Sequence, residues 1–185
     1  MPNILGISGS LRRASFNTSL LRAAVELAPA GTTIEIASIA EIPLYNADVE
    51  AAGIPAAVQA PKDKVAAADG LLIATPEYNN SIPGVVKNTI DWLSRPPSDV
   101  PKIFRDKKVA IMGATPGQGG PLLSQAAWLP ILRTLGGDPW FAGRLGISGA
   151  DNVFDANGKL IDEGVRERLK KFVDGFAAFC DKRPT

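Results

Sequence analysis

Short apolar runs alternate with longer amphipathic stretches along most of this chain. The runs at 4–8, 70–75 and 108–114 are apolar almost throughout, which predicts strands buried on both faces of a sheet. Residues 32–36 (TTIEI) alternate and are β-branched, so a further strand is expected there. The segment 140–147 holds the last predicted strand.

Between these strands, apolar residues recur at the three-to-four-residue spacing of helices. The pattern predicts helices over 17–27, 55–68, 84–93, 122–135 and 162–181. Strands that alternate with helices indicate βαβ units and therefore an α/β protein with a parallel sheet. Right-handed crossovers leave few topologies, and a doubly wound sheet of about five strands in the order 2-1-3-4-5, with helices on both faces, is the natural choice.

Several residues mark where these helices begin and end. Asn17 or Thr18 is the expected N-cap of the first helix, and Pro55 is expected in the first turn of the second. Pro130 is expected to kink the helix over 122–135, and the proline-rich segment 95–101 is expected to be a loop. The length of 185 residues fits one domain, so residues 1–185 are interpreted as a single unit.

Ligands of open parallel sheets bind at the carboxyl ends of the strands, where the strand order reverses. Three unusual loops follow the predicted strands there: 9–17 (GSLRRASFN), 76–84 (PEYNNSIPG) and 115–120 (TPGQGG). The first opens a helix, whose free N–H groups attract anions, and it adds the guanidinium groups of Arg12 and Arg13. An ordinary strand–helix connection with two solvated arginines is the alternative.

The second and third loops suit a flat ligand. Tyr78 can pack beside a planar heterocycle, and the glycine-rich third loop has so little side-chain bulk that a ring can lie on its backbone. A rigid connector and a plain turn are the alternatives, and Trp92 is expected in the core.

Composition narrows the chemistry. The chain has 20 basic and 19 acidic residues, so it lacks the concentrated basic charge that nucleic acid or an anionic membrane requires. It has no histidine, which excludes a Ser-His-Asp or Cys-His mechanism and most zinc sites. Its one cysteine, Cys180, cannot form an internal disulfide. The absence of histidine in particular favours a bound cofactor as the source of the reactivity.

The first residues have no basic segment before their apolar run, and no apolar run approaches the roughly 20 residues of a membrane span. A cytoplasmic protein is the expectation. Residues 151–163 faintly suggest a calcium loop, but Val153 would then occupy the position of the first acidic ligand, so a tight turn at Asn157-Gly158 is preferred. No metal site is expected. Trp128, Trp140 and Phe141 suit either a core or an interface.

Two motifs together carry a family resemblance. G-S-x-R-x-x-S-x-N follows the first strand, and P-E-Y-N-x-S-x-P-G-x-x-K-N-x-I-D-W follows the third. The chain from Asn3 to about Phe179 thereby resembles the NADPH-dependent FMN reductase family, and most of all its bacterial chromate/quinone reductase branch. The resemblance implies a flavodoxin-like fold and non-covalently bound FMN.

The resemblance also assigns site residues by position. It places six residues around the FMN phosphate: Ser10, Arg12, Ser15, Phe16, Asn17 and Thr18. It places four along the isoalloxazine ring and two at the other side of that ring: Pro76, Glu77, Tyr78 and Asn79, then Thr115 and Gly117. No protein side chain is assigned the hydride chemistry, which occurs on the FMN.

The implied activity is oxidation of NAD(P)H with hydride transfer to FMN, followed by two-electron reduction of a small acceptor in a ping-pong pattern. Quinones, chromate, azo compounds and free flavin all suit that role, and family members are typically homodimers or homotetramers. The choice between NADPH and NADH stays open, with Arg12 or Arg13 as a candidate partner for a 2′-phosphate. A flavodoxin-type electron carrier is the main alternative, although such carriers are usually strongly acidic. A flavin-binding regulatory module is a lesser one.

Overall fold

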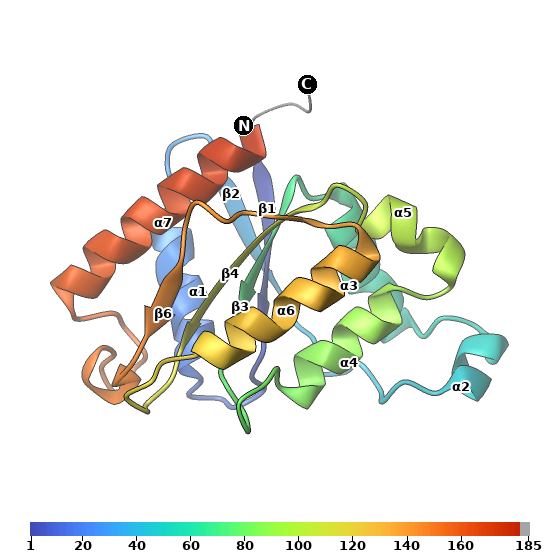
Figure 1. The fold of residues 1–185 in the computed structure, drawn as a ribbon, viewed down its shortest axis with the longest axis horizontal. Helices are drawn as coiled ribbons and strands as arrows, with labels where there is room; N and C mark the ends of the chain where they lie inside the picture. Colours follow the sequence, from blue (N-terminus) through green and yellow to red (C-terminus); the bar gives the residue numbers. More distant parts are fainter. Residues whose placement is uncertain (182–185) are drawn as a thin grey trace.

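A parallel sheet lies between two layers of helices in the computed structural model of the chain (Figure 1). The structure describes residues 1–181, so residues 182–185 of the expected domain lie outside it. The strands are β1 (Asn3–Ser8), β2 (Thr33–Ala37), β3 (Gly70–Ala74), β4 (Lys108–Ala114), β5 (Asp138–Pro139) and β6 (Leu145–Ile147). The helices are α1 (Phe16–Glu26), α2 (Ala47–Ala52), α3 (Ala56–Ala67), α4 (Gly84–Leu93), α5 (Val100–Ile103), α6 (Leu122–Leu135) and α7 (Glu163–Asp181).

The strand order confirms the predicted topology. Neighbouring strands run β2-β1-β3-β4-β5 and pair in parallel, which is the flavodoxin-like order 2-1-3-4-5. Ser8 at the end of β1 pairs with Ala74 at the end of β3, and Ala74 pairs with Met112 near the end of β4. The register therefore brings the ends of the three central strands to one line, here called the carboxyl edge.

The last position of the sheet differs from the prediction of one strand over 140–147. Two short segments fill it, because β5 pairs with the start of β4 and β6 pairs with its end. Between them the backbone leaves the sheet, and the indole of Trp140 packs against Phe172 and Phe176 of α7. Gly143 lies so close to that indole that a Cβ there would stand 2.2 Å from a ring carbon. Packing of one large side chain thus interrupts the strand.

Each face of the sheet has its own apolar cluster. Helices α1 and α7 cover one face, and α3, α4, α5 and α6 cover the other (Figure 1). Trp92 and Trp128 are among the largest fully buried side chains, so the expectation for Trp92 is confirmed and Trp128 is a core residue. Phe141 is 75% exposed and is therefore a surface residue.

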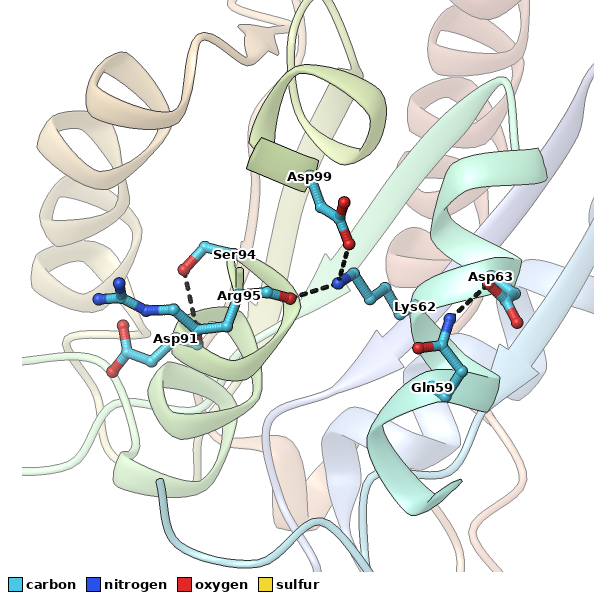
Figure 2. Close-up of polar contacts among 7 residues, drawn as sticks. All are labelled: Gln59, Lys62, Asp63, Asp91, Ser94, Arg95 and Asp99. Atoms are coloured by element: carbon cyan, nitrogen blue, oxygen red, sulfur yellow. Dashed lines mark hydrogen bonds and ion pairs between the residues drawn. The ribbon is translucent and has the colours of Figure 1, made fainter. Parts of the chain in front are cut away.

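The segment 95–101, expected to be a loop, is more ordered than its prolines suggest. It contains a 3-10 turn at Pro97–Asp99 and the first residues of α5. The ammonium of Lys62 on α3, only 3% exposed, binds this segment through the carboxylate of Asp99 at 2.5 Å and the carbonyl of Arg95 (Figure 2). A buried cation therefore joins α3 to the connection between α4 and α5.

Two local predictions about helix ends need correction. Ser15, and neither Asn17 nor Thr18, is the N-cap of α1, because its hydroxyl accepts the N–H of Thr18. Pro55 is the residue before α3 and does not lie in its first turn. Both shifts are one to three residues, the usual error where caps compete.

The segment 151–163 contains the tight turn that was expected at Asn157-Gly158. The carboxylate of Asp155 accepts the N–H groups of Asn157 and Lys159, and Gly158 has a φ of 78°. Within residues 1–181, no three acidic or sulfur side chains gather where they could hold a metal ion. None of the helices described here is both long enough and apolar enough to cross a membrane.

Candidate functional site

The three loops singled out by sequence meet at the carboxyl edge, at the bottom of the molecule in Figure 1. Each begins with a backbone hydrogen bond to a neighbouring strand. The N–H of Gly9 donates to Ala74 at 2.8 Å, that of Thr75 to Met112 at 2.9 Å, and that of Thr115 to Ile147 at 2.9 Å. The sheet therefore fixes the starting points of all three loops side by side.

Gly9 allows the first two loops to touch. A Cβ at this position would stand 3.0 Å from Cδ of Pro76 and 3.3 Å from the carbonyl oxygen of Ala74. The residue has no positive φ, so glycine is needed here for the close approach of the two loops. Gly113 of β4 has the same role more strongly, because its Cβ would stand 2.1 Å from the carbonyl oxygen of Thr75.

The N-terminus of α1 has free donors. Ser15 is buried and caps the helix, while the hydroxyl of Thr18 donates to Ser8 at 2.9 Å. Among the acceptors of residues 1–181, none is found for the backbone N–H groups of Phe16 and Asn17. Two unpaired N–H groups at a helix N-terminus are the basis of an anion site.

The two arginines of this loop are exposed and carry no ion pair with any described residue. The guanidinium of Arg12 lies 5.1 Å from the ring centre of Phe16 and donates to the carbonyl of Ala14 at 2.5 Å. This folded position keeps the charge of Arg12 within the loop. Both guanidinium groups remain free of carboxylates and can therefore meet an incoming anion.

Asn17 joins two of the loops through its side chain. Its side chain is 2% exposed, donates to the carbonyl of Ala114 at 2.9 Å and accepts the N–H of the same residue at 3.0 Å. The amide thus pairs with the last residue of β4 as another strand would. Its side chain joins the first loop to the start of the third, while its backbone N–H and the second N–H of the amide have no acceptor among residues 1–181.

Glu77 is likewise held by another element. One carboxylate oxygen accepts the N–H of Leu123 at 2.7 Å and that of Ser124 at 3.0 Å, in the first turn of α6. A negative charge at that end of a helix is favourable. The hydroxyls of Thr75 and Ser124 meet at 2.9 Å directly beside this contact. The second loop is therefore bound to the helix that follows the third.

A two-residue turn forms the tip of the second loop, which the sequence analysis did not anticipate. Tyr78 and Ser81 exchange both backbone hydrogen bonds, while Asn79 and Asn80 have φ values of 50° and 60°. Asparagine tolerates the left-handed region better than other non-glycine residues, so the Asn-Asn pair was the available signal. The turn leaves the side chain of Tyr78 half exposed at the carboxyl edge.

The third loop is open, as its composition indicates. A Cβ at Gly117 or Gly119 would meet no atom within 4 Å. A fourth segment supports this loop: the N–H of Gly149 donates to Gly117 at 3.3 Å, and that of Ala150 donates to Thr115 at 3.0 Å. No expectation from the sequence included this segment, although Ser148-Gly149 after the last strand is a turn signal.

The expected site residues thus all lie in loops that the carboxyl edge brings together, but they divide into two groups. Ser15, Asn17, Thr18 and Glu77 bind other parts of the protein through their side chains. The groups left for a ligand are the guanidinium groups of Arg12 and Arg13, which form no ion pair with a described residue, the N–H groups of Phe16 and Asn17, and the bare backbone of the third loop. Such an edge can hold an anion at one end and a flat ring at the other.

Comparison with known proteins agrees with this geometry. Residues 2–150 match the family model for NADPH-dependent FMN reductase. The chain is 46% identical over 168 residues to an NAD(P)H-dependent FMN reductase of Pseudomonas aeruginosa, covering 91% of this chain and 89% of that one. It is 38% identical over 183 residues to a 2-hydroxy-1,4-benzoquinone reductase of a Burkholderia species, covering 96% and 95%.

A solved structure shows the same architecture along the whole chain. The flavoenzyme NAD(P)H:(acceptor) oxidoreductase of Paracoccus denitrificans superposes with a TM-score of 0.82 at 30% identity, covering 98% of both chains. Motif, fold and overall similarity therefore point to one group of proteins. The chain belongs to the NADPH-dependent FMN reductase family.

Proposed function

We propose that this protein oxidises NAD(P)H with FMN bound at the carboxyl edge and reduces a quinone or another small acceptor. As a member of its family it is an NAD(P)H-dependent flavin oxidoreductase with FMN as cofactor. The observation that supports the proposed site best is that the unpaired N–H groups at the start of α1 lie at the same edge of the sheet as the open backbone of the third loop.

The residues present fit FMN. The phosphate would bind the N–H groups of Phe16 and Asn17 and the guanidinium of Arg12, with the hydroxyls of Ser10, Ser15 and Thr18 around it. The ring would lie between the second loop, at Pro76 to Asn79, and the third, at Thr115 and Gly117. Asn17 and Glu77 act by holding these loops in place, because their side chains are already bound.

When bound, FMN supplies the hydride acceptor and donor, which no amino-acid side chain provides. The protein contributes binding and electrostatics. Within residues 1–181, the N–H groups of Gly117, Gln118 and Gly119 have no acceptor, so they can donate to a ligand edge that becomes negative on reduction. Tyr78 offers a half-exposed ring against which a flat nicotinamide or quinone can pack.

The acceptor and the assembly are also part of the proposal. Relatives named as quinone reductases support a quinone, while chromate, azo compounds and free flavin are further candidates. A homodimer or homotetramer is supported by a hollow of about 430 Å³ beside α6, whose wall includes the exposed side chains of Leu129 and Phe141. We further propose a cytoplasmic location, and no role for nucleic acid or a membrane.

A spectrum and a rate measurement test the proposal. The purified protein is expected to be yellow and to release FMN on denaturation. Initial rates with NAD(P)H and a benzoquinone are expected to give parallel double-reciprocal lines. A colourless protein that takes up no added FMN would contradict the site, and intersecting lines would contradict the two-step order.

The same assay separates an enzyme from an electron carrier. A carrier of the flavodoxin type would bind FMN but would oxidise NAD(P)H only when a separate reductase is added. The near-neutral charge of the chain and its exposed arginines favour the enzyme.

A further inference from the structure

A second hollow lies beside the phosphate loop, on the side of α1 that faces the turn at 155–160. Its volume is about 480 Å³. Two segments form its wall: residues of the first loop and α1, and residues that follow β6. The wall includes Arg12, Arg13, Phe16, Arg22, Phe154 and Asn157. Of the residues that the family resemblance places around FMN, only Arg12 and Phe16 also line this hollow.

The charge of this hollow is positive. Three guanidinium groups line it, and none of the ion pairs among residues 1–181 involves Arg12, Arg13 or Arg22. Two carboxylates also line it, those of Asp151 and Asp155. The carboxylate of Asp155 is engaged by the backbone of its own turn. Three guanidinium groups against two carboxylates leave a net charge of +1, and a dianionic group gains more from it than a singly charged anion because the interaction energy scales with the charge.

The same hollow has an aromatic wall. The rings of Phe16 and Phe154 stack with centres 5.9 Å apart and an angle of 21° between their planes. The guanidinium of Arg12 lies over the ring of Phe16. Phe154 is only 4% exposed and Phe16 lies between it and the guanidinium of Arg12, so the two rings form a rigid apolar wall with no free face for stacking.

Close packing holds the two walls at a fixed distance. Gly158 has a φ of 78°, and a Cβ there would stand 2.5 Å from the hydroxyl oxygen of Ser19 on α1. The bridge between Phe154 and Leu160 closes the turn behind it. The hollow is therefore a formed feature of the fold and does not need a ligand to bring Arg22 and Asn157 together.

We propose that this hollow binds the adenosine 2′-phosphate end of NADPH, with Arg13 and Arg22 as the residues that select NADPH over NADH. The inference rests on the proposed function, since it names the nucleotide for the same reaction. A 2′-phosphate is a dianionic monoester that NADH lacks, and two guanidinium groups recognise it by paired hydrogen bonds. Arg12 remains with the FMN phosphate.

Binding of nucleotide fragments tests the hollow without turnover. Calorimetric titration of the FMN-loaded protein compares adenosine 2′,5′-bisphosphate with adenosine 5′-monophosphate. The bisphosphate is expected to bind more tightly than the monophosphate, and Arg22→Ala is expected to weaken the bisphosphate about tenfold and so to narrow that difference, in line with one lost charge-assisted hydrogen bond. Arg13→Ala/Arg22→Ala is expected to weaken it about a hundredfold. Arg133→Ala, an exposed arginine of α6 outside the hollow, is the matched control.

Steady-state kinetics then separates this inference from the proposed function. In the Arg22→Ala variant, KM for NADPH should rise by the same factor while the NADH reaction is unchanged. If the wild type oxidises both nucleotides but the arginine variants keep its NADPH/NADH ratio and its bisphosphate affinity, the hollow is not the 2′-phosphate site. Equal affinity for both fragments would also overturn it. If the wild type oxidises neither nucleotide, the proposed function fails, while the titration still tests the hollow.

Discussion

Asn17 and Lys62 are both buried polar side chains that join distant segments. Asn17 does so at the carboxyl edge, whereas Lys62 does so in a layer of helices. Asn17 uses a neutral amide to pair both backbone groups of Ala114 at the carboxyl edge. Lys62 uses a cation against Asp99, whose side chain is 38% exposed, in the helix layer on one face of the sheet (Figure 2). The amide sets a register between two ligand loops, whereas the ammonium ties helices together.

The difference indicates how this fold separates stability from binding. At the carboxyl edge, short side chains satisfy one another and hold the loops, which leaves the backbone N–H groups and the arginines for ligands. In the helix layer, the donors of Lys62 are used inside the protein. A change at Asn17 should therefore alter both the free energy of unfolding and the affinity for FMN. A change at Lys62 should alter only the free energy of unfolding.

The largest effect is expected from Asn17→Ala. The change leaves the N–H and carbonyl of Ala114 without partners in a buried place, which should lower the free energy of unfolding by about 3 kcal/mol. FMN should also bind more than about tenfold more weakly, because the first and third loops lose their link. Chemical denaturation and FMN titration measure the two quantities. Unchanged FMN affinity in a folded Asn17→Ala protein would show that Asn17, like Lys62, contributes to stability alone.

Lys62→Met should have a smaller effect, confined to stability. The variant keeps the apolar stem but leaves the Arg95 carbonyl and the half-exposed Asp99 carboxylate without their cation, at an expected cost of about 2 kcal/mol. Its FMN affinity and its KM for NAD(P)H should equal those of the wild type. A Lys62→Met protein with impaired FMN binding would show that the helix layer also shapes the site.

Glu77→Gln tests the other link at the carboxyl edge. The amide oxygen can still accept the two N–H groups of α6, but the negative charge at the helix N-terminus is lost, which should cost about 1 kcal/mol. FMN affinity should fall by less than in Asn17→Ala because the contact geometry is kept. Glu77→Ala, which removes the acceptor as well, should lower both quantities further; equal effects of Gln and Ala would instead assign the whole role to charge.

The smallest expected effect is on the pH dependence of the free energy of unfolding, and it concerns Cys180. Its thiol is buried and neutral, as the amide of Asn17 is, but it can ionise. Burial raises the pKa of its thiol to about 12, against an ordinary value of 9.0. The unfolded chain therefore loses this proton at lower pH than the folded one, so its contribution to stability is complete below pH 9 and declines as the pH rises toward 12. At pH 9.5 the decline should be about 0.8 kcal/mol. Denaturation of wild type and Cys180→Ala at pH 8 and 9.5 measures it, since only the wild type should show this part of the slope.

Much of the fold and the place of the site could be predicted from the sequence, because strand periodicity and loop composition are local properties. The strand order, the three loops and the turn at Asn157-Gly158 follow from such patterns. The roles of Asn17 and Glu77 could not be predicted, since their partners lie 97 and 46 residues away. The expectation that they face the ligand came from their position in a motif, which does not show what a side chain binds.

The split of the last strand could not be predicted for a related reason. It depends on where Trp140 finds room against α7, a contact that no local pattern contains. The fourth segment at 148–150 was missed because its hydrogen bonds join it to the third loop and not to its own neighbours.

The split strand also affects how the protein behaves toward other chains. An uninterrupted edge strand would present a row of unpaired backbone N–H and carbonyl groups. Another extended chain can pair with such a row, which can lead to aggregation. Here that edge strand consists of two residues ending in Pro139, which has no N–H to offer, and three residues of β6. The detour around Trp140 keeps the two pieces apart. The molecule thereby gains protection from unwanted strand addition at the side of the sheet nearest its third loop.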